Sequence, residues 1–158
     1  MSKAVLISIR PKWCEKIASG EKTIEVRKTM PNLPTPFKAY IYCSQGNDAR
    51  RLRGSWGKVI GEFTCERIVP ITYDGGRLWC PTNAAFSPAT CLSQAEIIAY
   101  VGDKGRCYGW HISDLRIYDT PRDLGEFSPA CTYKSDDGTC QTRRVACSFQ
   151  QWDYNQDG

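Results

Sequence analysis

The 158-residue sequence predicts a mainly β, α+β fold: one small mixed β-barrel of five to six strands with two to three short helices. Short apolar runs rich in β-branched residues recur along the chain, two short segments have helical spacing, and no internal repeat is visible. With 41% hydrophobic and 24% charged residues, the composition is that of a globular protein long enough to bury a core.

The first three expected elements are a strand, a short helix and a second strand. Lys3–Ile9 is aliphatic and β-branched, which favours a buried strand. Pro11 suits the first turn of a helix, and Gly20 suits its C-terminal end. From Thr23 to Lys28 polar and apolar residues alternate, which predicts a half-buried strand.

Three more strands and a second helix are expected further along. The strands are Phe37–Cys43, residues 58–68 with a bulge or bend at Gly61, and residues 107–118 with a break near Asp114; a short strand over residues 71–73 is a further candidate. Ser93 and Glu96 form a capping box for the helix, which Gly102 ends.

Two regions of the chain are expected to lie outside this regular structure. Residues 74–90, rich in Gly and Pro, predict an irregular segment. The polar end of the chain predicts a division into a domain at 1–124 and a cysteine-containing extension at 125–158.

The distribution of charge favours an anionic ligand. Residues 1–67 carry 13 Lys and Arg against 6 Asp and Glu, whereas residues 68–158 carry 8 against 11. Arg50, Arg51 and Arg53, beside Trp56, form a basic loop that could follow a phosphate backbone while the indole stacks on a base. A solvated loop with no ligand is the alternative.

Membrane insertion and secretion are not expected. No apolar run approaches the ~20 residues of a membrane span. Residues 1–10 lack a long apolar segment followed by a cleavage site, so the sequence predicts a cytoplasmic protein. The oligomeric state stays open.

The nine cysteines do not suggest a disulfide framework, because their number is odd and no signal peptide precedes them. Cys14, Cys43 and Cys65 have apolar neighbours and are expected to be buried thiols. A weak candidate zinc site exists in the extension, although the close-spaced ligand pairs typical of zinc are missing, and no cofactor is required. Its ligands would be Cys131, Cys140 and Cys147.

The segment from Ser8 to Lys28 carries the strongest chemical signal. Glu25 and Arg27 leave the same face of their strand, and Lys22, at the turn before it, reaches the same opening if the turn reorients it. Arginine and lysine donate to anions or polar bases, while a glutamate can orient them or act as a general acid or base. An ordinary surface ion pair is the alternative.

The runs SIRPKW and SGEKTIEVR resemble the signature of the ASCH domain family, whose members are similar to RNA-binding PUA domains. The Gly-x-Lys-x-x-Glu-x-Arg core of that family is matched by Gly20, Lys22, Glu25 and Arg27. The runs GKVIGEF and GWHISDL resemble the middle and last barrel strands, the latter as in phage- and prophage-type members. The resemblance covers roughly residues 3–124 and implies a PUA-like pseudobarrel with a cleft formed by the GEKTIEVR segment.

The resemblance implies an RNA- or nucleotide-binding domain, with RNA or a modified nucleoside as the ligand. A second reading is a Lys22-dependent hydrolase, either an N4-acetylcytidine-type amidohydrolase or a ribonuclease, with Glu25 as a catalytic partner. The small deacylases of the family have a threonine where this chain has Glu25, and their catalytic glutamate has no counterpart in residues 87–92. A third reading is a phage accessory protein that binds another protein.

Further ligand-binding candidates flank this segment. Arg10 lies in the SIRPKW run, and Trp110 and His111 lie in the expected last strand. Trp110 is expected to stack on a base, and His111 to line the floor of the cleft, although a structural histidine is the more common case.

Overall fold

The computed structural model describes residues 3–46, 54–81, 86–129 and 150–153. Within these residues one eight-stranded sheet has the strand order β2-β6-β4-β3-β1-β8-β7, and β5 pairs with β4. The pairing of β1 with β3 is parallel and the others are antiparallel. The strands are β1 (Lys3–Ile9), β2 (Ile24–Arg27), β3 (Phe37–Cys43), β4 (Lys58–Asp74), β5 (Arg77–Trp79), β6 (Arg106–Asp123), β7 (Ser128–Pro129) and β8 (Gln150–Asp153).

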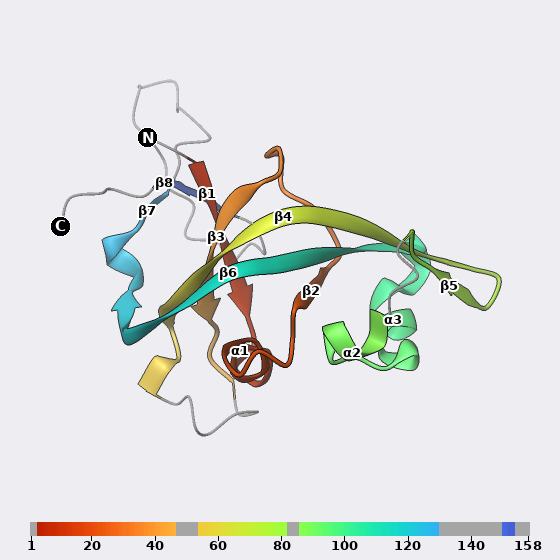
Figure 1. Cartoon of the computed structure of the whole chain (residues 1–158), viewed down its shortest axis with the longest axis horizontal. Coiled ribbons are helices and arrows are strands. Elements are labelled where there is room, and N and C mark those ends of the chain that lie inside the picture. The colour runs from red at the N-terminus through yellow and green to blue at the C-terminus, as the bar shows by residue number, and fades with distance from the viewer. Residues whose placement is uncertain (1–2, 47–53, 82–85, 130–149, 154–158) are drawn as a thin grey trace.

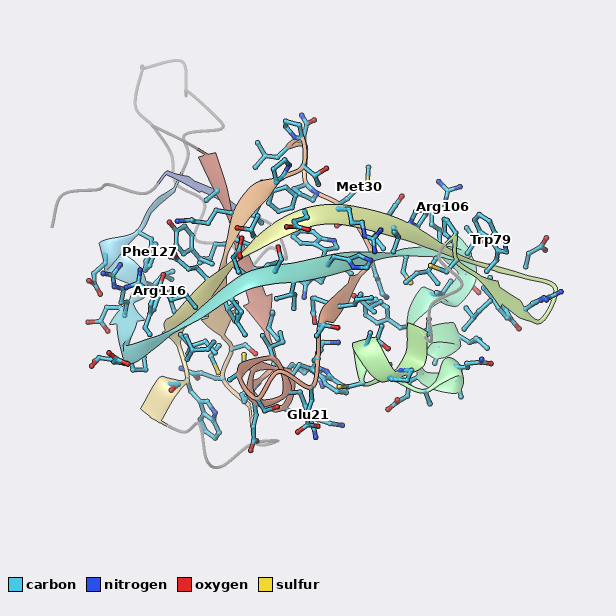
Figure 2. All side chains as sticks on the ribbon, in the orientation of Figure 1. Glu21, Met30, Trp79, Arg106, Arg116 and Phe127 are labelled. Atoms are coloured by element: carbon cyan, nitrogen blue, oxygen red, sulfur yellow. The ribbon has the colours of Figure 1, made fainter. Side chains whose placement is uncertain are left out.

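Two long antiparallel strands, β4 and β6, run the length of the molecule (Figure 1). Their ladder changes register at three places, one of them between Val59 and Gly61. Asp114, in a second irregular stretch, has a left-handed φ of 47°. These bulges let long strands bend around the core, as strand irregularities commonly do. Figure 2 shows Phe127 near one end of the pair and Trp79 with Arg106 near the other.

Three short helices lie on one side of the sheet in the view of Figure 1: α1 (Pro11–Ala18), α2 (Phe86–Thr90) and α3 (Gln94–Val101). Pro11 occupies the first turn of α1, and the capping box of Ser93 and Glu96 opens α3, as the sequence predicted. Ile17 of α1 packs into the main core, whereas Ile97 of α3 packs into a second cluster with Ile71. The two helices are thus fixed at separate places along the sheet.

The mainly β, α+β class is confirmed, and the sheet is open rather than closed. It has more strands than the expected five to six because β5, β7 and β8 were not anticipated. Irregular structure over residues 74–90 was wrong in part, since β5 and α2 lie there. The predicted bounds of β1 and β3 are confirmed.

The sheet continues past residue 124. β8 pairs with β1, β7 pairs with β8, and Phe127 packs against Tyr40 with ring centroids 4.9 Å apart. The division at residue 124 stays a prediction, as does the zinc site, because Cys131, Cys140 and Cys147 lie outside the described residues.

Two further expectations can be compared with the described residues. Cys14, Cys43 and Cys65 are fully buried, as predicted. In the described part of the chain, no helix is long and apolar enough to cross a membrane.

A substitution at Gly61 tests how closely β4 and β6 approach each other. A Cβ atom on Gly61 would lie 2.5 Å from the carbonyl oxygen of Arg116 and 3.1 Å from the Cα of Ile117, so the two strands would have to separate. We expect Gly61→Ala to lower the free energy of unfolding by about 1–3 kcal/mol, the usual cost of overpacking. Urea denaturation measures this change.

The matched control is Gly125→Ala, because a Cβ atom on Gly125 meets nothing within 4 Å. Equal denaturation midpoints for the two variants would show that the close contact at Gly61 does not limit stability.

Candidate functional site

A cavity of about 780 Å³ opens between α1, β2 and α3. Its walls come from the end of β1, from α1 and β2, and from the loop and helix that follow α2. The lining residues are Ser8, Ile9, Arg10, Trp13, Lys22, Glu25, Val26, Arg27, Ser44, Leu92, Glu96 and Tyr100. The cavity therefore brings together residues that are separated by up to about 90 positions in the sequence.

The turn between α1 and β2 directs Lys22 into this cavity. Gly20 adopts a left-handed φ of 81°, which is favourable for glycine, and the main-chain N–H of Lys22 donates to the carbonyl of Lys16 at 3.0 Å. The side chain of Lys22 is 2% exposed, and its Nζ donates to the carbonyl of Thr90 at 2.6 Å. This turn overcomes the strand parity that would otherwise point Lys22 away from Glu25.

Glu25 lies between two cations. Its Oε2 is 3.5 Å from Lys22 Nζ, and its Oε1 is 3.6 Å from Arg27 Nη1. Arg27 also donates from Nη1 to the carbonyl of Ser8 at 3.0 Å. We call Lys22, Glu25 and Arg27 the ionic triad. It links the start of β2 to β1 and to the end of α2, so one carboxylate organises three segments.

Burial dominates the electrostatics of the triad. The pKa of the Lys22 ammonium is lowered by burial, and the charge of Glu25 partly opposes that effect. Glu25 is itself 5% exposed. A buried ion pair loses much of its Coulombic gain to desolvation, so the triad is a weak stabiliser of the fold for its size.

Two aromatic side chains from different helices line the cavity, Trp13 from α1 and Tyr100 from α3. Lys22 Nζ lies 5.1 Å from the centre of the Trp13 ring. The pKa of Tyr100 is raised, mainly by burial, with smaller influences from the charges of Arg27 and Glu25. The hydroxyl of Tyr100 therefore belongs to the electrostatic environment of the triad.

The sequence analysis did not identify Trp13, Glu96 or Tyr100 as cavity residues. Trp13 entered only as part of the SIRPKW run, and Glu96 only as part of a capping box. A signal for Tyr100 was present in its spacing of four residues from Glu96, because positions i and i+4 of a helix lie on one face. The neighbours of that face depend on how α3 packs against the rest of the fold. The spacing of residues alone does not reveal this packing.

The expected placement of Trp110 and His111 at the cleft was wrong. Trp110 is fully buried in the core, with its ring centroid 5.5 Å from that of Phe37 in an edge-to-face arrangement. Trp110 belongs to the main core cluster together with Ile9 of β1 and Ile17 of α1, so core side chains cover it. His111 leaves the opposite face of β6 and does not line the cavity. Burial lowers the pKa of His111.

The remaining sequence candidates fall into two groups. Arg10 is exposed and lines the cavity. Arg50, Arg51 and Arg53 lie outside the described residues. Within the described part of the chain, no group of three His, Cys, Asp or Glu side chains could hold a metal ion.

The charge state of Lys22 gives a test of this geometry. Because burial lowers its pKa, we expect the Lys22 ammonium to lose its proton at a lower pH than Lys16, whose pKa is raised by a hydrogen bond and ion pair with Glu21. NMR titration of the two lysine side-chain Cε signals measures both midpoints in one sample. A Lys22 midpoint at or above that of Lys16 would contradict the buried position.

Comparison with known proteins identifies the fold. No protein-family model and no curated protein sequence matches the chain. The structure is similar to crystal structures of an ASCH protein from Zymomonas mobilis: TM-score 0.57 and 22% identity for the protein itself, over 77% of this chain and 74% of that one.

Two variants of the same Zymomonas mobilis protein give similar values. A tyrosine-to-phenylalanine variant has a TM-score of 0.58 at 22% identity, over 77% of this chain and 76% of that one. A serine-to-alanine variant has a TM-score of 0.55 at 24% identity, over 77% and 75%. The expected similarity to phage-type members stays a prediction. The chain has the fold of an ASCH domain.

Proposed function

We propose that this ASCH-type domain binds RNA, and that one nucleotide enters the cavity lined by the GEKTIEVR segment. The observation that carries the proposal is the ionic triad, which is buried and yet lines a cavity. Apolar side chains of similar volume would support the fold as well as a buried ion pair does. The triad therefore has a better explanation as a recognition surface than as a stabilising device.

The triad offers a nucleobase both kinds of hydrogen-bonding partner. Lys22 and Arg27 present donors, and Glu25 presents acceptors, within one cavity. The edge of a base also combines donors and acceptors, and a site built from fixed polar partners discriminates strongly against a base that leaves them unpaired. In this proposal the base pairs with the triad, and Glu25 holds the two cations in position.

The aromatic walls supply the stacking that Trp110 does not. Trp13 and Tyr100 line the cavity from two different helices. A base between such walls must be unstacked from its neighbours, which favours single strands and loops over duplex RNA. Arg10, exposed at the cavity, adds a positive charge for phosphate. The basic loop containing Arg50, Arg51 and Arg53 remains a candidate for further backbone contacts.

A hydrolase is the second candidate, and the charge state of Lys22 favours it. Burial lowers the pKa of its ammonium, which raises the fraction of neutral amine at a given pH, and a neutral amine can act as a nucleophile or a general base. The substrates of this reading are N4-acetylcytidine or RNA. Both candidate functions use the same cavity. They differ in whether the bound RNA or nucleoside is hydrolysed.

The variant Lys22→Met separates these functions, because it retains much of the side-chain length and removes the amine. If Lys22 contacts the ligand, we expect affinity for a labelled mixed-sequence single-stranded RNA to fall about 10- to 100-fold, the usual worth of a hydrogen bond to a charged group. Fluorescence anisotropy measures binding. Chromatography of N4-acetylcytidine and of the RNA after incubation measures conversion.

The matched control is Lys16→Met, because Lys16 is exposed on α1, pairs with Glu21 and does not line the cavity. If the wild type hydrolyses N4-acetylcytidine or the RNA and Lys22→Met does not, the protein is a hydrolase that depends on Lys22. Equal RNA affinity in wild type and Lys22→Met, with both variants folded by circular dichroism, would remove Lys22 from the binding site.

A further inference from the structure

Each aromatic wall of the cavity carries an exposed lysine. Lys12 Nζ lies 4.5 Å from the centre of the Trp13 ring, and Lys28 Nζ lies 5.1 Å from the centre of the Tyr100 ring. Among the described residues, neither ammonium takes part in an ion pair. Both lysines combine a long flexible stem with a charge that has no ion-pair partner among the described residues.

The two lysines stand at different places along the cavity. The pKa of Glu96 is lowered, chiefly by its hydrogen bonds with Ser93 and in smaller part by the charge of Lys12, so Lys12 lies near the first turn of α3. Lys28 lies over Tyr100, one turn further along that helix. The two cations therefore lie over rings that belong to different helices, α1 and α3.

The inner part of the cavity has a different character from these edges. The two cations of the triad share one carboxylate, and Lys22 and Arg27 also donate to main-chain carbonyls. Because the charges of the triad already have partners in the protein, this part of the cavity suits a neutral polar base. At about 780 Å³, the cavity is near the upper part of the ~300–1,000 Å³ range for small-molecule sites, which leaves room beyond a single base.

We infer that the cavity takes an internal nucleotide of a single-stranded RNA rather than a free nucleoside, and that Lys12 and Lys28 bind the phosphates on its two sides. The inference rests on the proposed function and names its substrate class. A free nucleoside has no phosphate and leaves both ammoniums without a role. An internal nucleotide has a phosphate on each side, which matches one lysine on each wall.

The contacts that the lysines make in the structure are compatible with this role. A cation–π contact at an exposed site is weak, and a lysine stem has several rotatable bonds. Each ammonium can therefore leave its ring for a phosphate, which uncovers the ring for stacking. The phosphate contacts would add salt-dependent affinity, whereas base recognition by the triad would add affinity that depends little on salt.

The test compares two probes on four proteins. The probes are an equimolar mixture of the four ribonucleosides and a labelled mixed-sequence pentaribonucleotide. The proteins are the wild type, Lys12→Ala/Lys28→Ala, Lys22→Met and a control, Lys38→Ala. Lys38 is also an exposed lysine near an aromatic ring, at 6.0 Å from that of Tyr40, but Tyr40 does not line the cavity and Lys38 pairs with Glu62. Affinities are measured at 50 and 200 mM salt, by calorimetry and anisotropy.

We expect the wild type to bind the pentanucleotide more tightly than the nucleosides, and the double variant to bring the two affinities closer. Each phosphate contact to a single strand contributes about 0.7 to the slope of log affinity against log salt. Between 50 and 200 mM salt, the wild type should therefore lose about sevenfold more affinity than the double variant. Lys38→Ala should behave as the wild type.

Three outcomes overturn the inference in distinguishable ways. Equal binding of nucleosides and pentanucleotide by the wild type, lost in Lys22→Met, keeps the proposed function and rejects the internal nucleotide. An unchanged salt slope in the double variant rejects Lys12 and Lys28 as the phosphate ligands. Wild-type protein that binds neither probe rejects the proposed function together with the inference.

Discussion

The cavity depends on one buried carboxylate. Glu25 lies within 3.6 Å of both Lys22 and Arg27, and those cations reach the carbonyls of Thr90 and Ser8. Removal of Glu25 would leave two largely buried cations close together, and an uncompensated buried charge typically costs about 3–5 kcal/mol. Because the partners of the cations belong to β1 and to the end of α2, this carboxylate also sets the distance between the walls.

The fold supplies a rigid frame for that arrangement at a strand on the edge of the sheet. β2 has four residues and, among the described strands, pairs with β6 alone, so its position needs further support. The main-chain N–H of Thr23 donates to the carbonyl of Ala89, and the N–H of Ile112 donates to the carbonyl of Thr23, both at 2.9 Å. The long strands β4 and β6 hold β2, while α1 and α3 are each fixed by their own core cluster. A cavity between two separately anchored helices can keep its shape without a ligand.

The sequence predicts the elements whose signal is local. β1 and β3 are continuous apolar runs, and the helices α1 and α3 have proline or capping signals at their starts. β5 and α2 were missed because Gly and Pro in that region suggest irregular structure. The proximity of Lys22, Glu25 and Arg27 followed from spacing and from the turn at Gly20. Tyr100 could not be placed, because its contact with the cavity depends on how α3 packs. Trp110 was misplaced because its spacing fits the cavity side as well as the core, and burial by β4 and β3 decides between them.

The central claim is that RNA is recognised in the cavity between α1, β2 and α3. The most direct measurement is NMR mapping of backbone amide shifts during titration with a mixed-sequence single-stranded RNA. The account predicts that the largest changes fall on residues 10–13, 22–27 and 92–100, and that the amides around Tyr118 and Phe127 change little. Changes centred on Tyr118 and Phe127, which pack together at the other end of the long strands, would contradict it, as would the absence of any change at saturating RNA.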